Sequence, residues 1–130
     1  MLDSIEERQQ EQAECDRKEK RVREVLDRLA HLQQGSSVFG RKSSSGRLVS
    51  AWEWKIAVEW ALQRIGTVCA VILEQRLRHD RSFVSLAGRL GIESGEAVYM
   101  YQVGLICFTE QMDTLNRNGI PDDYTERVAA

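Results

Sequence analysis

Apolar positions along the chain recur at helical spacing, and they divide the sequence into two helical regions separated by a polar stretch. Residues 1–34 are dense in charge, but Val22, Val25, Leu29 and Leu32 lie three or four positions apart. This spacing predicts a charged amphipathic helix with a short apolar seam. Two alternatives fit the seam: it docks one end of the helix on its own domain, or it serves an arm that dimerises or binds a partner. If it is an arm, removal of residues 1–34 should leave the domain folded.

The stretch from Gly35 to Gly46 has no helical pattern and reads GSSVFGRKSSSG. Its serines and glycines predict a flexible linker over residues 35–46. The linker is either a tether or, through Arg41 and Lys42, a basic loop that meets a polyanion. After it, we expect a helical domain over residues 47–117 and a mobile acidic tail over residues 118–130.

Helical periodicity resumes from Leu48 to Arg78, with a predicted break near Gly66. Two faces of this helix are apolar. Trp52, Ile56 and Trp60 recur every fourth residue on one face, and Trp54, Val58, Leu62 and Ile65 cover another. Two apolar faces predict a helix buried on more than one side, so the tryptophans are expected in the core. The alternative is that an exposed tryptophan anchors a partner.

The segment from Arg81 to Leu105, RSFVSLAGRLGIESGEAVYMYQVGL, has the pattern of a helix-turn-helix. Ala87 is small where two helices would cross closely, and Gly91 stands where the turn needs a left-handed backbone. We expect motif helices near 82–90 and 94–115, with Ser94 as the N-cap of the second. Apolar side chains would fill the angle between the helices: Leu86, Leu90, Ile92, Ala97 and Met100. An ordinary helical hairpin that ends on a glycine cap is the alternative.

A helix-turn-helix would place its second helix in the major groove of DNA. Four arginines surround the first motif helix and could contact phosphates, although they also fit a solvated helix end with favourable dipole placement. The exposed side of the second helix holds two glutamates and no basic residue, so sequence-specific binding by the chain alone is expected to be weak. The same surface would suit a protein partner. The candidate DNA-binding residues are Arg76, Arg78, Arg81, Arg89, Ser94, Tyr99 and Gln102.

Composition and residue spacing argue against several other classes of function. The chain has 130 residues with 18 basic and 20 acidic side chains, a net charge of −2, which gives no general attraction to nucleic acid. The three cysteines have no metal-ligand spacing, and Cys69 and Cys107 lie in apolar runs typical of core thiols. No catalytic pair, phosphate loop or metal cluster is evident, so we expect neither an enzyme nor a cofactor. Without an apolar signal region or a span-length apolar run, a cytoplasmic protein is expected.

The block ILEQRLRHDRSFVSLAGRLGIESGEAVYMYQVGLICFTEQM, about residues 72–115, resembles the C-terminal segment of phage late-gene regulators. These are the Q-type antitermination proteins and the related ArpU-type activators, whose module is similar to sigma factor region 4. The resemblance implies action near a bacteriophage late promoter together with host RNA polymerase. The second helix departs from this pattern in being poorly basic. The pattern is carried by Ile72, Leu73, Phe83, Ser85, Leu86, Ala87, Leu90, Ile92, Leu105, Phe108 and Met112.

Two functions follow as hypotheses. In the first, the chain is a phage-type transcription regulator, a late-gene antiterminator or activator, that binds double-stranded DNA and RNA polymerase. In the second, it is a helical adaptor or inhibitor that binds a protein without contacting DNA. Either function is compatible with a dimer formed through residues 22–32. The fold expected in both cases is all-α, with a helix-turn-helix domain behind a charged N-terminal helix and a flexible linker.

Overall fold

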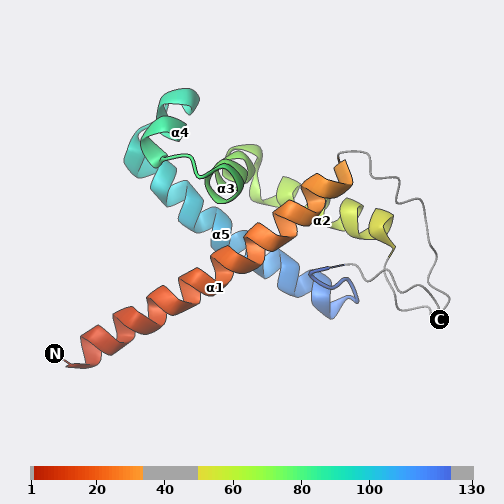
Figure 1. Cartoon of the computed structure of the whole chain (residues 1–130), viewed down its shortest axis with the longest axis horizontal. Helices are drawn as coiled ribbons and strands as arrows, with labels where there is room; N and C mark the ends of the chain where they lie inside the picture. Colours follow the sequence, from red (N-terminus) through yellow and green to blue (C-terminus); the bar gives the residue numbers. More distant parts are fainter. Residues whose placement is uncertain (1, 34–49, 124–130) are drawn as a thin grey trace.

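The computed structural model describes residues 2–33 and 50–123, and within these ranges the chain is helical. Figure 1 shows its five α-helices, and the described part contains no strand. The predicted all-α class is therefore confirmed, while the predicted linker at 35–46 lies outside the described residues. The helices are α1 (Leu2–Gln33), α2 (Ala51–Ile65), α3 (Thr67–His79), α4 (Phe83–Leu90) and α5 (Ser94–Arg117).

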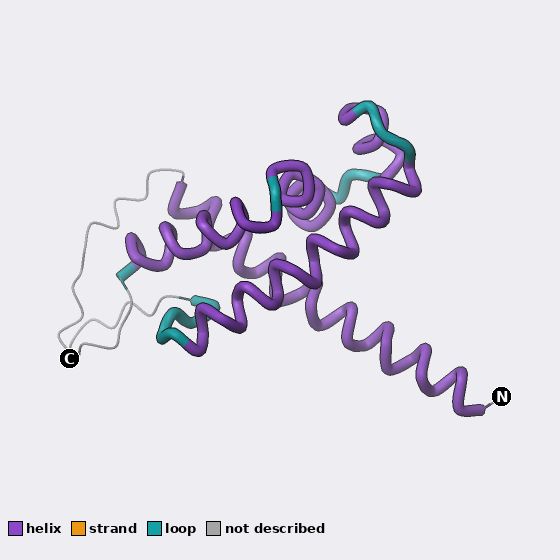
Figure 2. The backbone as a smooth tube through the Cα atoms, turned by 180° about the vertical axis from the view of Figure 1, so that it is seen from behind, coloured by secondary structure: helices purple, strands orange, loops and turns teal. Residues whose placement is uncertain are grey.

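Helix α5 is the centre of the packing, because it contacts each of the other four helices. It runs diagonally through the molecule and crosses α1 near the middle (Figures 1 and 2). Leu105, Phe108 and Met112 on α5 are at most 3% exposed. The long second motif helix predicted to reach about residue 115 thus forms the main support of the core.

Helix α1 is divided into a docked half and a projecting half (Figure 1). The seam residues Val22, Val25, Leu29 and Leu32 are buried in the chain's own core, whereas residues 4–14 are exposed. The seam therefore docks on its own domain, and a dimer through residues 22–32 would require this packing to open. Because these apolar side chains complete the core, removal of residues 1–34 is now expected to damage the fold rather than leave it intact.

Helices α2 and α3 come from the predicted broken helix. The Ser50 hydroxyl accepts a hydrogen bond from the Glu53 backbone N–H at 3.1 Å and caps α2. Gly66 separates the two helices with a φ of 98°, and their axes differ in direction by 113°. The positive φ is available to glycine at little cost, so the predicted break near Gly66 is confirmed.

The expected burial of both apolar faces of α2 is wrong. Trp54 and Val58 are fully buried, but Trp52, Ile56 and Trp60 are 58%, 49% and 54% exposed. The neighbouring helices cover only one side of α2, so no other described helix packs over the second apolar face.

The chain after α5 is held against the domain. Asn118 caps α5, in agreement with the predicted end of that helix, and Ile120 packs on the core. The Trp54 ring N–H donates to the Pro121 carbonyl at 3.0 Å, and Arg21 forms an ion pair with Asp122 at 2.6 Å. Residues 118–123 therefore belong to the folded domain rather than to the predicted mobile tail; residues 124–130 lie outside the described part.

Candidate nucleic-acid interface

The turn between α4 and α5 contains the left-handed glycine that both the helix-turn-helix and the glycine-capped hairpin require. Gly91 has a φ of 70° and a ψ of 32°, in the left-handed region. The backbone N–H of Ile92 donates to the carbonyl of Ala87 at 3.0 Å, the bond that closes a Schellman motif at a helix end. At the other end of α4, the Ser82 hydroxyl accepts from the Ser85 N–H at 3.1 Å. Both ends of α4 are thus fixed by local hydrogen bonds.

Apolar side chains fill the angle between the two motif helices as expected. Leu86, Ala87 and Ala97 are at most 4% exposed. The other expected side chains, Leu90, Ile92 and Met100, are half-buried against the core. Their burial fixes the angle at which α5 leaves the turn, and it leaves the opposite side of α5 available to a partner.

The first turn of α5 differs from the prediction. Glu93, rather than Ser94, occupies the N-cap position, and its side chain makes no capping hydrogen bond. The three-residue turn leaves Glu93 extended, with a φ of −79° and a ψ of 151°, so Ser94 is already the first helical residue. Ser94 is exposed, and its hydroxyl is therefore at the surface at the start of α5.

Arg78, predicted to contact phosphate, joins α3 to α1 instead. Its side chain is 20% exposed and forms ion pairs with Asp27 at 3.1 Å and with Glu74 at 3.2 Å. Asp27 lies on the docked half of α1, 51 residues away in sequence. The guanidinium is thus already engaged by two carboxylates, which lowers its value for a phosphate.

Arg76 and Arg81 brace the connection between α3 and α4. The Arg76 guanidinium lies over the Phe83 ring at 4.7 Å and donates to the Arg81 carbonyl at 3.2 Å. Arg81 donates through Nε to the Gln75 side chain at 3.2 Å. Arg89 differs from both. It is exposed in the last turn of α4, and it makes no ion pair or hydrogen bond with other described residues.

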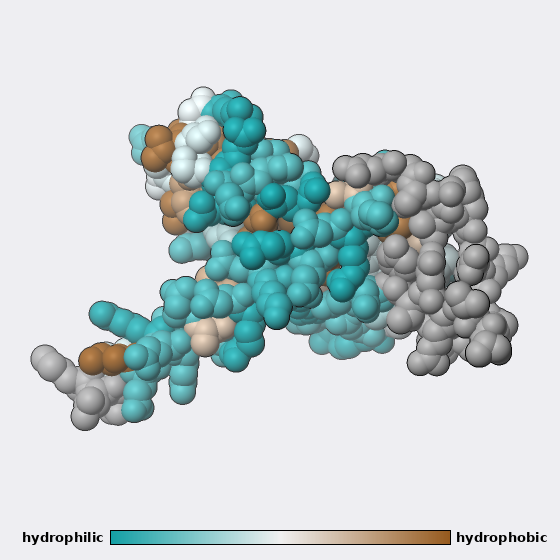
Figure 3. Space-filling view, in the orientation of Figure 1, coloured by the Kyte–Doolittle hydropathy of each residue, from teal (hydrophilic) through white to brown (hydrophobic). Residues whose placement is uncertain are grey.

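The exposed side of α5 combines neutral, apolar and acidic groups. Tyr99 is 67% exposed, Gln102 is also exposed, and Glu93 and Glu96 flank the start of the helix. On neighbouring α4, Val84 is 72% exposed. Figure 3 shows apolar surface beside polar surface at the α4 end of the molecule, at the upper left of the view. Arg89, Ser94, Tyr99 and Gln102 are therefore the predicted residues that remain accessible on the two motif helices.

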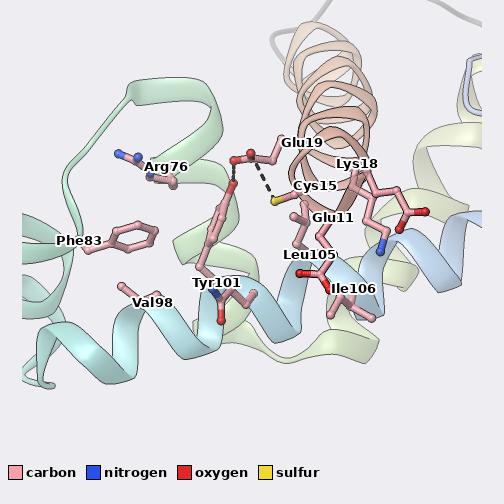
Figure 4. A pocket seen from close by; sticks show the side chains of 12 residues that line it. Glu11, Cys15, Lys18, Glu19, Arg76, Phe83, Val98, Tyr101, Leu105 and Ile106 are labelled. Atoms are coloured by element: carbon pink, nitrogen blue, oxygen red, sulfur yellow. Dashed lines mark hydrogen bonds between the residues drawn. The ribbon is translucent and has the colours of Figure 1, made fainter. Parts of the chain in front are cut away.

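A cleft of about 430 Å³ lies between α1 and α5 and reaches Arg76 and Phe83 (Figure 4). Two predicted DNA-binding residues, Arg76 and Gln102, line this cleft. Its base includes Leu105 and Ile106 from α5, and its α1 wall carries carboxylates. The cleft exists because the projecting half of α1 departs from the domain at an angle to α5.

Tyr101 links the cleft's two long walls. Its hydroxyl donates to the Glu19 carboxylate, and its ring meets Phe83 edge to face at 5.3 Å between centroids. Burial and the Glu19 carboxylate both raise the pKa of Tyr101, so the tyrosine stays protonated. Cys15 donates to Glu19 at 3.7 Å, and its pKa is raised by burial and by the same carboxylate.

The sequence pattern missed this α1 contribution. Cys15 and Glu19 precede Val22 by about two helical turns and one helical turn, so they continue the docking face where the apolar seam ends. Polar side chains can dock on a partner that supplies a hydrogen bond. Tyr101 donates that hydrogen bond to Glu19. The two residues are 82 positions apart, so the sequence pattern does not connect them.

The remaining chemistry in the described residues is sparse. Among the described residues, no group of three or more His, Cys, Asp or Glu side chains is placed to bind a metal ion. No single helix in this part is long and apolar enough to cross a membrane. Helices α2 and α3 reach that length and composition only when they are taken together across their bend. Cys69 and Cys107, predicted as core thiols, are half-buried, and burial raises the pKa of Cys69. Comparisons with family models, curated proteins and solved structures found no match to this chain.

Proposed function

We propose that this chain is a helix-turn-helix transcription regulator that contacts double-stranded DNA through α4 and α5 and depends on a protein partner for tight binding. The observation that carries the proposal is the α4–α5 turn. It combines a left-handed Gly91, a buried Ala87 at the helix crossing and an α5 face left open to solvent. These are the requirements for presenting a second helix to the major groove.

The accessible residues divide the DNA contact into two parts. Arg89 and the Ser94 hydroxyl, with the first N–H groups of α5, are placed to contact phosphate. Gln102 can pair with adenine, and Tyr99 offers a neutral, mostly apolar contact to a base. The carboxylates of Glu93 and Glu96 repel the DNA phosphates. Such a surface supports weak binding rather than the roughly 10⁻⁸ M or tighter affinity of autonomous regulators.

RNA polymerase is the partner implied by the resemblance to phage late-gene regulators. A second, protein-mediated attachment would raise the effective concentration of α5 at the promoter without better base contacts. In this proposal the chain acts as an antiterminator or activator of late genes, and the projecting half of α1 is available for the protein contact.

The test measures binding to a short duplex of mixed sequence by fluorescence anisotropy over a range of salt concentrations. We expect Arg89→Ala to weaken binding and to lower the salt slope by about one unit, because one phosphate contact is lost. Arg117→Ala is the matched control, since Arg117 is also exposed but ends α5 far from the turn. Equal slopes for wild type and Arg89→Ala, with and without RNA polymerase, would refute the DNA contact.

The second candidate is a protein-binding adaptor that does not contact DNA. The observation that favours it is the engagement of Arg76, Arg78 and Arg81 inside the fold, which leaves little positive charge for DNA. Binding of purified RNA polymerase that is equally tight without DNA, and unchanged by Arg89→Ala, would favour this function over the first.

A further inference from the structure

Helix α2 carries an apolar stripe that the other described helices leave partly exposed. The stripe consists of Trp52, Ile56 and Trp60, which are 58%, 49% and 54% exposed. The opposite side of the same helix, with Trp54 and Val58, is fully buried. Two half-exposed tryptophans in line with an isoleucine form an apolar patch of the kind that marks an interaction surface.

Charged side chains of both signs border the stripe. At 3.6 residues per turn, Lys55 and Glu59 fall on one edge, and Glu53 and Arg64 fall on the other. Lys55 pairs with Glu59 at 3.8 Å within the helix and also lies 5.3 Å from the Trp52 ring centre. Arg64 lies 4.7 Å from the ring centre of Trp60. Each edge therefore carries one acidic and one basic residue.

We propose that the stripe binds a second copy of this chain, with the two α2 helices antiparallel about a two-fold axis at Ile56. The two isoleucines then meet at the centre, and Trp52 of each copy lies against Trp60 of the other. The stripe is symmetric about Ile56, since a tryptophan stands four residues to either side. An isologous interface requires this kind of self-complementary surface.

The bordering charges are complementary in the same arrangement. In an antiparallel pair, like edges face each other, so Lys55 of one copy faces Glu59 of the other with an axial offset of about 3 Å. Glu53 and Arg64 face each other across the second edge with an offset of about 7.5 Å, which long side chains can span. The antiparallel order also sets the helix dipoles in opposition, which favours it over a parallel pair.

The size of the stripe indicates a weak, reversible dimer. A tryptophan buries about 150–250 Å² when it is fully covered, so the stripe supplies on the order of 300 Å² per copy. Standard interfaces bury about 800 Å² per partner, and the flanking residues of α2 add only part of the difference. We therefore expect a dissociation constant in the micromolar range or above.

The first experiment measures the oligomeric state of the full chain by sedimentation velocity across a wide concentration range. We expect a monomer–dimer equilibrium, and we expect Ile56→Glu to raise the dissociation constant at least about tenfold by burying a charge. Ile5→Glu is the matched control, because Ile5 is 54% exposed on α1 and lies outside the stripe. Circular dichroism confirms that both variants are folded. A wild-type chain that is monomeric at every concentration would overturn the proposal.

The second experiment tests the antiparallel order with charge reversals. Lys55→Glu and Glu59→Lys should each weaken self-association several-fold, because like charges then face each other. An equimolar mixture of the two variants should restore dimerisation, since each reversed residue meets an opposite charge on the other chain. The Lys55–Glu59 pair within each helix stays broken in the mixture, so any recovery arises between chains. A mixture that associates no better than the separate variants would overturn the antiparallel pairing.

Discussion

Gly91 sets the direction in which α5 leaves α4. A side chain added at this position would meet no atom within 4 Å, so the constraint is the backbone and not the available space. Left-handed φ values cost L-residues energy because Cβ approaches the carbonyl oxygen, and asparagine pays less of this cost than a β-branched residue.

We therefore expect Gly91→Val to lower the free energy of unfolding by about 1–3 kcal/mol. Gly91→Asn should retain most of the stability, although it adds a side chain of comparable size. Chemical denaturation of both variants is the measurement. Equal losses for valine and asparagine would mean that crowding, rather than the backbone angle, limits this position.

Asp122 holds the end of the described chain against α1 through Arg21. Burial alone would raise the pKa of Asp122, but two hydrogen bonds and the charge of Arg21 outweigh it and leave that pKa below the usual value. The hydrogen bonds that Arg21 donates to Asp122 in turn raise the pKa of Arg21. A carboxyl whose pKa is lowered by folding stabilises the fold above its unfolded pKa, about 3.9, and loses that contribution as the pH falls through the folded value.

Asp122→Asn should accordingly lower the free energy of unfolding by about 0.5–1.5 kcal/mol at neutral pH, with a smaller difference from wild type below about pH 4. Asp123→Asn is the control, because Asp123 is more exposed and lies 3.9 Å from Arg28. Urea denaturation at neutral and acid pH measures both effects. A difference that is independent of pH would contradict the ion-pair explanation.

Among the elements, α3 and α5 pack closely against each other at Gly104. A Cβ at Gly104 would lie 3.2 Å from the Cβ of Cys69 and 3.5 Å from Leu73 Cγ. Both helices are held in place by their packing against the other helices. Neither can move apart at Gly104 without disturbing the core.

Gly104→Leu should therefore destabilise the fold by about 1–3 kcal/mol through overpacking. Gly88→Leu on α4 is the matched change, because a side chain there meets nothing within 4 Å and leucine favours helix. Thermal unfolding of the two variants compares them directly. If the Gly104→Leu variant melts no lower than the Gly88→Leu variant, α3 and α5 have room for a side chain at Gly104.

Helix positions could be predicted from sequence, because they depend on local signals. The caps and breaks at Gly66 and Gly91 act within a few residues, and apolar periodicity marks α4 and α5. The side of α2 that is buried could not be predicted, since Trp52 and Trp54 belong to equally apolar faces. Which face is covered depends on how the other helices approach.

The candidate site was harder to predict for the same reason. Arg78 and Arg89 look alike in sequence, but Arg78 has Asp27 as a partner 51 residues away, whereas Arg89 remains exposed. Only the tertiary arrangement separates an arginine that supports the fold from one that can bind a ligand. The Glu19–Tyr101 hydrogen bond was missed because nothing local connects the two residues.

At the scale of the whole molecule, α1 has a docked half and a projecting half whose contributions to stability a truncation series can separate. Removal of residues 1–14 deletes only the projecting half and should leave the melting temperature within a few degrees of the full chain, because exposed positions contribute little. Removal of residues 1–34 takes away Val22, Val25 and Leu29 from the core and should abolish cooperative unfolding. Calorimetry distinguishes these outcomes. Cooperative melting of the shorter chain would mean that residues 50–123 fold alone.

The contact between Arg21 and Asp122 spans 101 residues, and Trp54 reaches Pro121 over 67 residues. Proteins dominated by such distant contacts fold more slowly, since the loop must close before the contact can form. On the ribosome, α1 emerges well before α5 and Asp122, at about 5–20 residues per second. During that interval its apolar seam lacks the part of its cover that α5 supplies. The N-terminal helix is thus exposed to chaperones and proteases for several seconds before its own domain can receive it.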